Sequence, residues 1–144
     1  MSNPIHGLNG VHFCGDAQDT RMLGWRLGEA AFPGLVVALD GPLGAGKTEF
    51  VKGLAEGLGC ADAASSPTFA IAHQYPGGRF PLHHFDFYRI ESEEELLTCG
   101  FEELSDDGVV AVEWAVRFSA RLPRGAVWVR IEIPPSGGRV VTIG

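Results

Sequence analysis

The octapeptide at residues 41–48, Gly-Pro-Leu-Gly-Ala-Gly-Lys-Thr, constrains the fold more than any other part of the chain. It matches the phosphate-loop (P-loop) pattern Gly-x-x-x-x-Gly-Lys-Thr, whose glycines let successive backbone N–H groups point at phosphate oxygens. In this pattern the lysine reaches the β- and γ-phosphates and the threonine hydroxyl ligates Mg²⁺. The motif therefore predicts a nucleoside triphosphate site with Mg²⁺. Its predicted binding residues are Gly41, Leu43, Gly44, Ala45, Gly46, Lys47 and Thr48, with Thr48 also on the metal.

The residues on either side of the loop fit the strand and the helix that the motif requires. Residues 35–39 are a continuous apolar run, as expected for a central parallel strand buried on both faces. After the loop, apolar residues recur at helical spacing until Gly59, so a helix N-terminus adds its dipole to the anion site. The alternative is a chance glycine turn, since 20 of the 144 residues are glycine. Against it, one of only two lysines, Lys47 and Lys52, occupies the phosphate-binding position.

Length and composition favour one globular domain. A chain of 144 residues can bury one core, and 45% hydrophobic with 20% charged residues argues against disorder. We expect a single P-loop domain over residues 1–144. No apolar run approaches the ~20 residues of a membrane span and no basic-then-apolar leader opens the chain, so we expect a cytoplasmic protein with no membrane partner. The scattered cysteines, Cys14, Cys60 and Cys99, predict reduced thiols.

The net charge of −7 bears on the class of partner. A protein that grips nucleic acid alone usually presents a basic face to the phosphates. Arginines do gather toward the C-terminus, but acidic residues between positions 91 and 107 oppose them. Strong direct binding to RNA or DNA is therefore disfavoured, although a small basic patch stays open. The arginines are Arg117, Arg121, Arg124, Arg130 and Arg139.

Hydrophobic periodicity and turn residues predict alternating strands and helices. Residues 69–75 and 80–87 indicate an antiparallel hairpin joined at residues 76–78, and residues 109–112 indicate a second fully buried strand. The fold class is therefore α/β: a single P-loop NTPase domain with a mixed, mainly parallel central sheet flanked by helices. The other predicted strands are 11–14, 127–133 and 139–143, and the other predicted helices are 19–31, capped by Asp19 or Thr20, 91–99 and 114–121.

Two acidic residues are expected where ligands bind, beyond the carboxyl ends of the strands. Glu113 directly follows the apolar strand 109–112, and Asp86 ends the strand before it. Either carboxylate can hold Mg²⁺ directly or through water, and either can orient a water for attack on a γ-phosphate. The alternatives are a solvated strand-end acid for Glu113 and an ion pair with Arg89 for Asp86.

Three other features are less decisive. Thr68 lies on a loop where a hydroxyl can sense the γ-phosphate and Mg²⁺, but a plain turn is the more economical interpretation. His83 and His84 are adjacent on a strand and so point to opposite faces, which favours core packing or a hydrogen bond over a metal site. Trp114 follows Glu113, and we expect core packing with proximity to the nucleotide as the alternative.

Four motifs occur in one order: the P-loop, Ser-Pro-Thr-Phe at residues 66–69, His-Phe-Asp-Phe-Tyr-Arg at 84–89 and Val-Glu-Trp at 112–114. Together they resemble the TsaE (YjeE) family, the small bacterial ATPases of tRNA threonylcarbamoyladenosine biosynthesis. The similarity runs from about Thr20 to Arg139. The P-loop alone would indicate only a superfamily, whereas the other three motifs make the resemblance specific.

The resemblance implies a protein that binds ATP and Mg²⁺ and hydrolyses ATP slowly. It implies docking on the threonylcarbamoyl transferase subunit TsaD and its inert relative TsaB, in support of modification at adenosine 37 of tRNA, which is reached through that complex. By position, Thr48 with Asp86 or Glu113 manages Mg²⁺ and Glu113 positions water. The resemblance also makes Thr68 a switch residue and Arg139 a candidate contact for the nucleotide base.

The loop departs from the family pattern at two positions. Pro42 stands where an acidic residue is common, and Glu49 stands where a small polar residue is common. Proline removes one backbone donor early in the loop, and the Glu49 carboxylate favours the helix dipole but repels phosphate. We expect nucleotide binding to persist.

Other functions are compatible with a P-loop alone. A small-molecule kinase is one alternative, in which Arg117, Arg121 and Arg124 would act like a lid, although 144 residues leave little room for both an acceptor domain and a lid. A GTPase is disfavoured because the asparagines, Asn3 and Asn9, cannot supply an Asn-Lys-x-Asp guanine reader. A nucleotide-dependent binding module with incidental hydrolysis is partly contained in the family interpretation.

Overall fold

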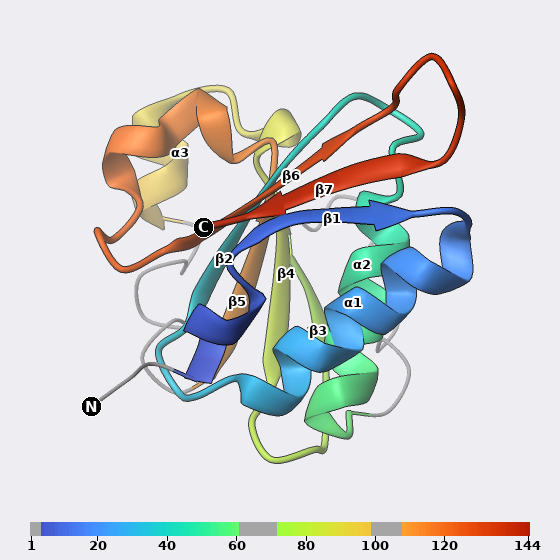
Figure 1. Cartoon of the computed structure of the whole chain (residues 1–144). Helices are drawn as coiled ribbons and strands as arrows, with labels where there is room; N and C mark the ends of the chain where they lie inside the picture. The colour runs from blue at the N-terminus through green and yellow to red at the C-terminus, as the bar shows by residue number, and fades with distance from the viewer. Residues whose placement is uncertain (1–3, 61–71, 99–107) are drawn as a thin grey trace.

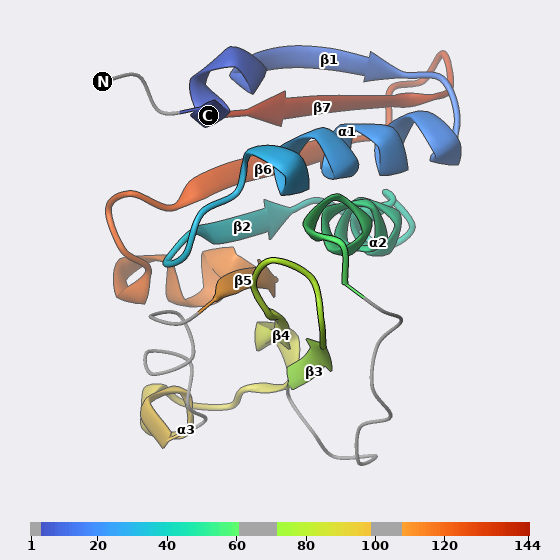
Figure 2. The ribbon, with the colours of Figure 1, turned by 90° about the horizontal axis from the view of Figure 1, so that it is seen from below.

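The computed structural model describes residues 4–60, 72–98 and 108–144. One seven-stranded sheet crosses this part of the chain, with helices packed against it (Figures 1 and 2). The strands are β1 (Gly10–Cys14), β2 (Val36–Asp40), β3 (Ala72–Tyr75), β4 (Leu82–Asp86), β5 (Val109–Glu113), β6 (Val127–Glu132) and β7 (Arg139–Ile143). The α-helices are α1 (Ala17–Ala30), α2 (Lys47–Leu58) and α3 (Glu93–Thr98), and the 3-10 helices are η1 (Pro4–Leu8), η2 (Phe87–Arg89) and η3 (Ala115–Arg121).

The strand order is β1-β7-β6-β2-β5-β4-β3. Strands β6, β2, β5 and β4 are parallel to one another. The pairs β1–β7, β7–β6 and β4–β3 are antiparallel, so antiparallel strands occupy both edges. The predicted α/β fold with a mixed central sheet is confirmed, and so is the hairpin of β3 and β4.

The two faces of the sheet carry separate hydrophobic cores because side chains alternate along each strand. In β2, Val37 and Leu39 pack in the larger core with α1 and α2. Val36 and Ala38 pack in the smaller core on the opposite face, with residues of η2, α3 and η3. All four side chains are buried, which accounts for the continuous apolar run in the sequence.

Helices α1 and α2 lie side by side and approach each other closely through glycines (Figures 1 and 2). A Cβ atom at Gly24 would lie 2.2 Å from the Phe50 carbonyl oxygen, and one at Gly53 would lie 1.9 Å from the Arg21 carbonyl oxygen. Only a residue without a Cβ fits at such positions. Helix α2 follows the P-loop directly, so this contact with α1 also fixes the loop against the sheet.

Several element boundaries differ from the sequence prediction. Helix α1 begins at Ala17, and Asp16 caps it by accepting a hydrogen bond from the Asp19 backbone N–H at 2.9 Å. The predicted caps, Asp19 and Thr20, were therefore wrong by about one turn. Asp16, Asp19 and Thr20 all carry side chains that can cap a helix, so the residue type alone does not select the cap.

The segments around the second buried strand also differ. Strand β4 ends at Asp86 rather than at residue 87, because the Asp86 carboxylate caps η2. The predicted helix at 114–121 is the 3-10 helix η3, with non-helical dihedral angles at Phe118. Residues 69–71 of the predicted hairpin lie outside the described residues.

The cysteines that the structure describes are free thiols, as predicted. Burial raises the pKa of the Cys14 thiol and, in the same way, the pKa of the Cys60 thiol. Both side chains are therefore kept in the protonated form, and Cys99 lies outside the described residues. Within the described ranges, no helix is long and apolar enough to cross a bilayer.

Candidate functional site

The carboxyl ends of the parallel strands bring the loop and the two predicted acids to one edge of the sheet. The P-loop leaves the end of β2, between its neighbours β5 and β6. Glu113 on β5 is the register partner of Leu39 on β2, and Asp86 on β4 is the register partner of Glu113. The sequence prediction that these acids gather beside the loop is therefore matched by the strand pairing.

Backbone geometry opens the loop toward a ligand. Gly46 caps α2 in the left-handed conformation, with φ at 106°, where residues with a Cβ are strained. At Gly41, a Cβ would lie 2.5 Å from the Ile131 carbonyl oxygen on β6. The first N–H groups of α2 have no partner within the helix, so this end of α2 offers donors and a positive dipole end to an anion.

Lys47 is the one buried side chain with a permanent positive charge among the described residues, at 6% exposed. Its Nζ donates a hydrogen bond to the Gly41 carbonyl oxygen at 2.7 Å and lies 4.5 Å from the centroid of the Trp114 ring. No carboxylate of the described residues lies within ion-pair distance of this ammonium. A buried cation without a counter-ion favours an anionic ligand.

Glu113 is held by a histidine from the neighbouring strand. His84 Nε2 and Glu113 Oε2 are 2.8 Å apart, and both side chains are mostly buried. Burial by itself raises the pKa of Glu113, but the hydrogen bond and charge of His84, with the charges of Lys47 and His73, outweigh it and lower the pKa overall. An ionised carboxylate suits a metal ion or a positioned water, and it does not suit proton donation.

Asp86 has a structural contact that the sequence did not predict. Its Oδ1 accepts a hydrogen bond from the Tyr88 backbone N–H at 3.0 Å and so caps η2. The alternative of an ion pair with Arg89 concerns a side chain outside those described. Thr68, the predicted switch residue, also lies outside the described residues.

Two cavities border the P-loop. The first, about 230 Å³, has Lys47, Thr48 and Glu113 in its wall. Because Thr48 is exposed, its hydroxyl is accessible from this cavity. The second, about 280 Å³, lies between the loop and the start of α1, where Asp16 and Thr20 line it. Of the predicted loop residues, Leu43, Gly44 and Gly46 line the first cavity and Gly44, Ala45 and Gly46 line the second.

Arg139 lines the second cavity, as its predicted contact with a nucleotide base requires, but each of its three nitrogens already donates to a backbone carbonyl. Its Nε donates to the Ala45 carbonyl oxygen at 2.9 Å, and its Nη2 donates to the Gly44 carbonyl oxygen at 3.1 Å. Its Nη1 donates to the Gly138 carbonyl oxygen at 2.6 Å. Arg139 thus ties the start of β7 to the P-loop.

The remaining aromatic predictions can be placed as well. Trp114 packs against the smaller core, and it adopts the left-handed conformation with φ at 58°, which is uncommon for a large side chain. Its ring lies 5.1 Å from that of Tyr88 and 4.5 Å from Lys47 Nζ, so the expected core packing is confirmed, and the ring also contacts the predicted phosphate-binding lysine. His83 is buried, and no metal-binding cluster of histidine, cysteine and carboxylate occurs in the described part of the chain.

Sequence reasoning missed the groups that support the loop from a distance. The Arg139 contacts join residues 94 and 95 positions apart, and the His84–Glu113 contact joins residues 29 positions apart. Asp40 at the end of β2 was also missed; it pairs with Arg130 on β6 at 3.3 Å. A salt-bridge partner that depends on the strand order leaves no local signal in the sequence.

Comparisons with known proteins agree with the resemblance. The model of the family described as Threonylcarbamoyl adenosine biosynthesis protein TsaE matches residues 14–140. The tRNA threonylcarbamoyladenosine biosynthesis protein TsaE of Treponema pallidum (strain Nichols) is 41% identical over 128 residues, covering 88% of this chain and 94% of that protein. The protein of the same name from Bacillus subtilis (strain 168) is 40% identical over 126 residues, covering 87% and 78%. The crystal structure of Bacillus subtilis YdiB superposes with a TM-score of 0.75 at 32% identity, covering 92% and 82%.

Proposed function

Because this chain belongs to the TsaE family of threonylcarbamoyladenosine biosynthesis proteins, we propose that it binds ATP with Mg²⁺ at residues 41–48 and hydrolyses it slowly. The observation that carries the proposal is the buried Lys47 ammonium, which no carboxylate of the described residues neutralises, beside the N-terminal amides of α2. Backbone donors, one cation and a nearby ionised Glu113 form a set suited to a triphosphate and its metal.

The residues present fit Mg²⁺ by their chemistry. Mg²⁺ prefers oxygen ligands and keeps several waters, and Thr48, Glu113 and Asp86 offer a hydroxyl and two carboxylates at neighbouring positions. In this proposal Thr48 holds the ion, with Glu113 or Asp86 holding it directly or through water. The ion would supply neutralisation of phosphate charge, and Glu113, kept ionised and oriented by His84, would position the attacking water.

The proposed partners are the transferase subunit TsaD and its inert relative TsaB, with tRNA reached through that complex in the cytoplasm. Membership of the family supports this proposal, and so does the net charge of −7, which disfavours a direct grip on tRNA. Pull-down of partners with ATP present and absent tests the docking. Depletion of the protein, followed by nucleoside analysis of tRNA, tests the role in modification.

Nucleotide binding is tested by substituting each of the two lysines. Lys47→Ala removes the cation that faces the β- and γ-phosphates, and we expect ATP affinity to fall by about 100-fold, since a charge-assisted contact contributes about 1.5–3 kcal/mol. Lys52→Ala is the matched control, because its ammonium is exposed and pairs only with Glu49 at 3.6 Å among the described residues. Unchanged ATP affinity in the Lys47 variant, measured by calorimetry, would contradict the site.

Hydrolysis is tested at Glu113. We expect Glu113→Ala to keep ATP binding and to lower phosphate release by about 10²-fold, as loss of a group that positions water or metal does. Glu132→Ala, which removes an exposed carboxylate from β6, is the control. Full activity in the Glu113 variant would move the role to Asp86. Assays of phosphate release with and without candidate acceptors also distinguish an ATPase from the small-molecule kinase alternative.

A further inference from the structure

The two cavities beside the P-loop meet at shared residues. Among the described residues, Gly44, Gly46 and Glu49 line both cavities. Glycine has no side chain, so among these three residues only Glu49 offers a polar side chain where the cavities meet. The Glu49 side chain is 31% exposed, and a ligand can therefore reach its carboxyl group.

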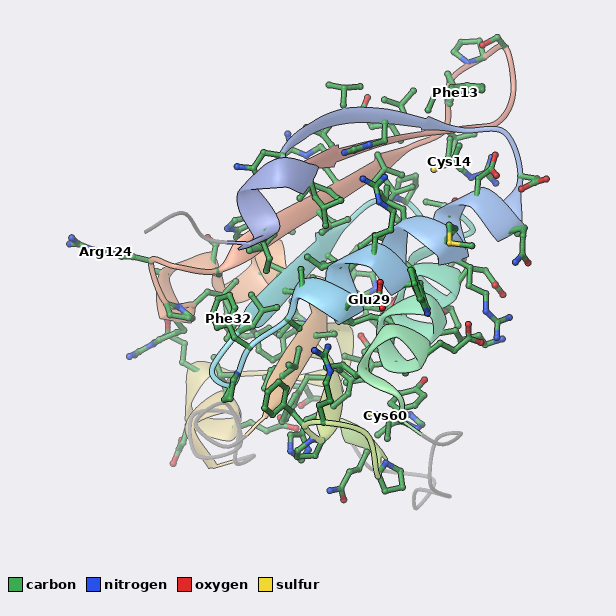
Figure 3. All side chains as sticks on the ribbon, turned by 60° about the horizontal axis from the view of Figure 1, so that its bottom comes forward. Phe13, Cys14, Glu29, Phe32, Cys60 and Arg124 are labelled. Carbon is green, nitrogen blue, oxygen red and sulfur yellow. The ribbon has the colours of Figure 1, made fainter. Side chains whose placement is uncertain are left out.

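The two cavities suit different parts of a nucleotide. The first has Lys47 and Glu113 in its wall, which belong to the site proposed above for the triphosphate and Mg²⁺. The second is bordered by Gly15, the residue after Cys14 (Figure 3), and by Arg139, the residue expected beside the base. A nucleotide bound in this way has its phosphates in the first cavity and its base in the second.

The order of groups in a nucleoside triphosphate places the ribose between these two cavities. The ribose joins the phosphates to the base, so a nucleotide that spans both cavities brings its sugar to the residues that they share. The 2′- and 3′-hydroxyl groups of ribose can donate hydrogen bonds, and an ionised carboxylate only accepts them. Glu49 is therefore chemically matched to a ribose hydroxyl at this point.

Glu49 also has acceptor capacity that other described residues leave unused. Its oxygens lie 3.6 Å from Lys52 Nζ and 3.9 Å from Arg21 Nη1, and both distances are longer than a hydrogen bond. These two cations orient the carboxylate without occupying its lone pairs. Asp16, which lines the second cavity, differs in this respect because it already accepts a hydrogen bond from the Asp19 backbone N–H at 2.9 Å.

The same carboxylate carries a negative charge close to the proposed phosphate site. Lys52 and Arg21, both within 4 Å of it, oppose its repulsion of phosphate. A hydrogen bond to an ionised acceptor, in contrast, is about twice as strong as one between neutral groups. The local charges therefore favour contact between Glu49 and the sugar over exclusion of the nucleotide.

We propose that Glu49 makes the nucleotide site selective for ribonucleotides by accepting a hydrogen bond from a ribose hydroxyl. This inference rests on the proposed nucleotide site, and it narrows the substrate class to ribonucleoside triphosphates. A site that is built to bind a substrate hydroxyl discriminates against the analogue that lacks it. Since the family pattern commonly has a small polar residue at this position, the selectivity belongs to this chain rather than to the motif.

Binding of ATP, 2′-deoxyATP and 3′-deoxyATP to the full chain with Mg²⁺, measured by calorimetry, tests the proposal. We expect the parent chain to bind ATP at least about tenfold more tightly than one of the two deoxy forms, as loss of a charge-assisted hydrogen bond implies. The form that binds weakly identifies the hydroxyl that Glu49 contacts.

Two substitutions separate a hydrogen bond from a charge effect. We expect Glu49→Ala to bring the ratio of the two affinities to about one, mainly by weakening the binding of ATP. Glu49→Gln keeps a neutral acceptor oxygen, so we expect it to retain part of the selectivity. If Glu49 acted only by repelling phosphate, both variants would bind all three nucleotides more tightly, and the proposal would be wrong.

Two other glutamates are matched controls. Glu56 also pairs with Arg21 but lines neither cavity, and Glu29 lies near the other end of α1 (Figure 3). Alanine at either position should leave the selectivity unchanged. Equal binding of the three nucleotides by the parent chain, or unchanged selectivity in Glu49→Ala, overturns this inference and leaves the proposed nucleotide site standing. A parent chain that binds no ATP overturns the proposed function and this inference with it.

Discussion

The close packing of α1 on α2 makes Gly53→Ala an informative perturbation. The added Cβ would lie 1.9 Å from the carbonyl oxygen of Arg21, which is a backbone atom of α1. A flexible side chain can rotate away from a new methyl group, but a helix carbonyl cannot move alone. The contact can only be relieved by separating the two helices by about 1 Å or more, since carbon and other heavy atoms pack at about 3.5–4 Å.

The size of the effect follows from the side chains that seal this interface. Leu23, Leu27, Phe50 and Leu54 are all at most 4% exposed and pack in the same core. Burial of each contributes about 2 kcal/mol, and a gap of 0.5–1 Å forfeits about a quarter to a half of the contact energy on the side that opens. That is a loss of about 2–4 kcal/mol. Alanine regains about 1 kcal/mol in helix propensity, so we expect the free energy of unfolding to fall by about 1–3 kcal/mol.

Urea unfolding, followed by circular dichroism, measures this change as a shift in midpoint at constant m-value. Gly125→Ala is the matched control, because a Cβ there meets nothing within 4 Å and its backbone is not left-handed. The control should gain about 0.4–1 kcal/mol through the unfolded chain. If Gly53→Ala were instead as stable as the parent, helix propensity would have decided the outcome and the inferred helix contact would be wrong.

Two other predictions concern the support of the loop. Arg139→Ala removes the donors to the Ala45 and Gly44 carbonyls, so we expect faster amide hydrogen exchange in the P-loop and an ATP affinity lower by about tenfold. Unchanged exchange rates would show that Arg139 does not hold the loop in place. Glu113→Gln should lower the free energy of unfolding at neutral pH, because the pKa of Glu113 is lowered in the folded state. The difference in the free energy of unfolding between the parent and the variant should be fully present above the usual pKa of 4.5, and it should shrink as the pH falls through the lowered pKa of Glu113. A difference that does not change with pH would contradict this prediction.

The local part of the site was predictable from the sequence because its signals are local. A buried strand, a glycine-rich turn and an amphipathic helix follow one another within residues 35–59, and each is specified by spacing within a few residues. The positions of Glu113 and Asp86 followed from the rule that parallel strands end at one edge of a sheet. That rule needs only the order of strands along the chain.

The contacts that complete the site depend on the order of strands in space. β6 lies beside β2, and the antiparallel β7 follows it, which returns Arg139 to the loop. Nothing near Arg139 in the sequence indicates that its partners are residues 44 and 45. The pairing of β4 with β5 likewise brings His84 to Glu113.

The glycines of α1 and α2 follow a spacing that indicates close packing of two helices, and sequence reasoning did not recognise it. Gly24 and Gly28 are four residues apart, and so are Gly53 and Gly57, so each pair lies on one helix face. A high glycine content seemed to favour turns, and it does so at Gly46. At these four positions it instead allows two backbones to approach, which becomes evident only once both helices are known to be neighbours.

The pairing of charges explains how a chain of net charge −7 can present an anion site. Three of the carboxylates near the loop contact a basic side chain: Glu113 contacts His84 at 2.8 Å, Asp40 contacts Arg130 at 3.3 Å, and Glu49 contacts Lys52 at 3.6 Å. The repulsion expected from Glu49 is therefore offset locally, with Arg21 also at 3.9 Å. Lys47 has only a carbonyl oxygen and an aromatic face. Since the Lys47 ammonium is buried and no carboxylate of the described residues lies within ion-pair distance of it, it favours an anion at the loop although the chain as a whole is acidic.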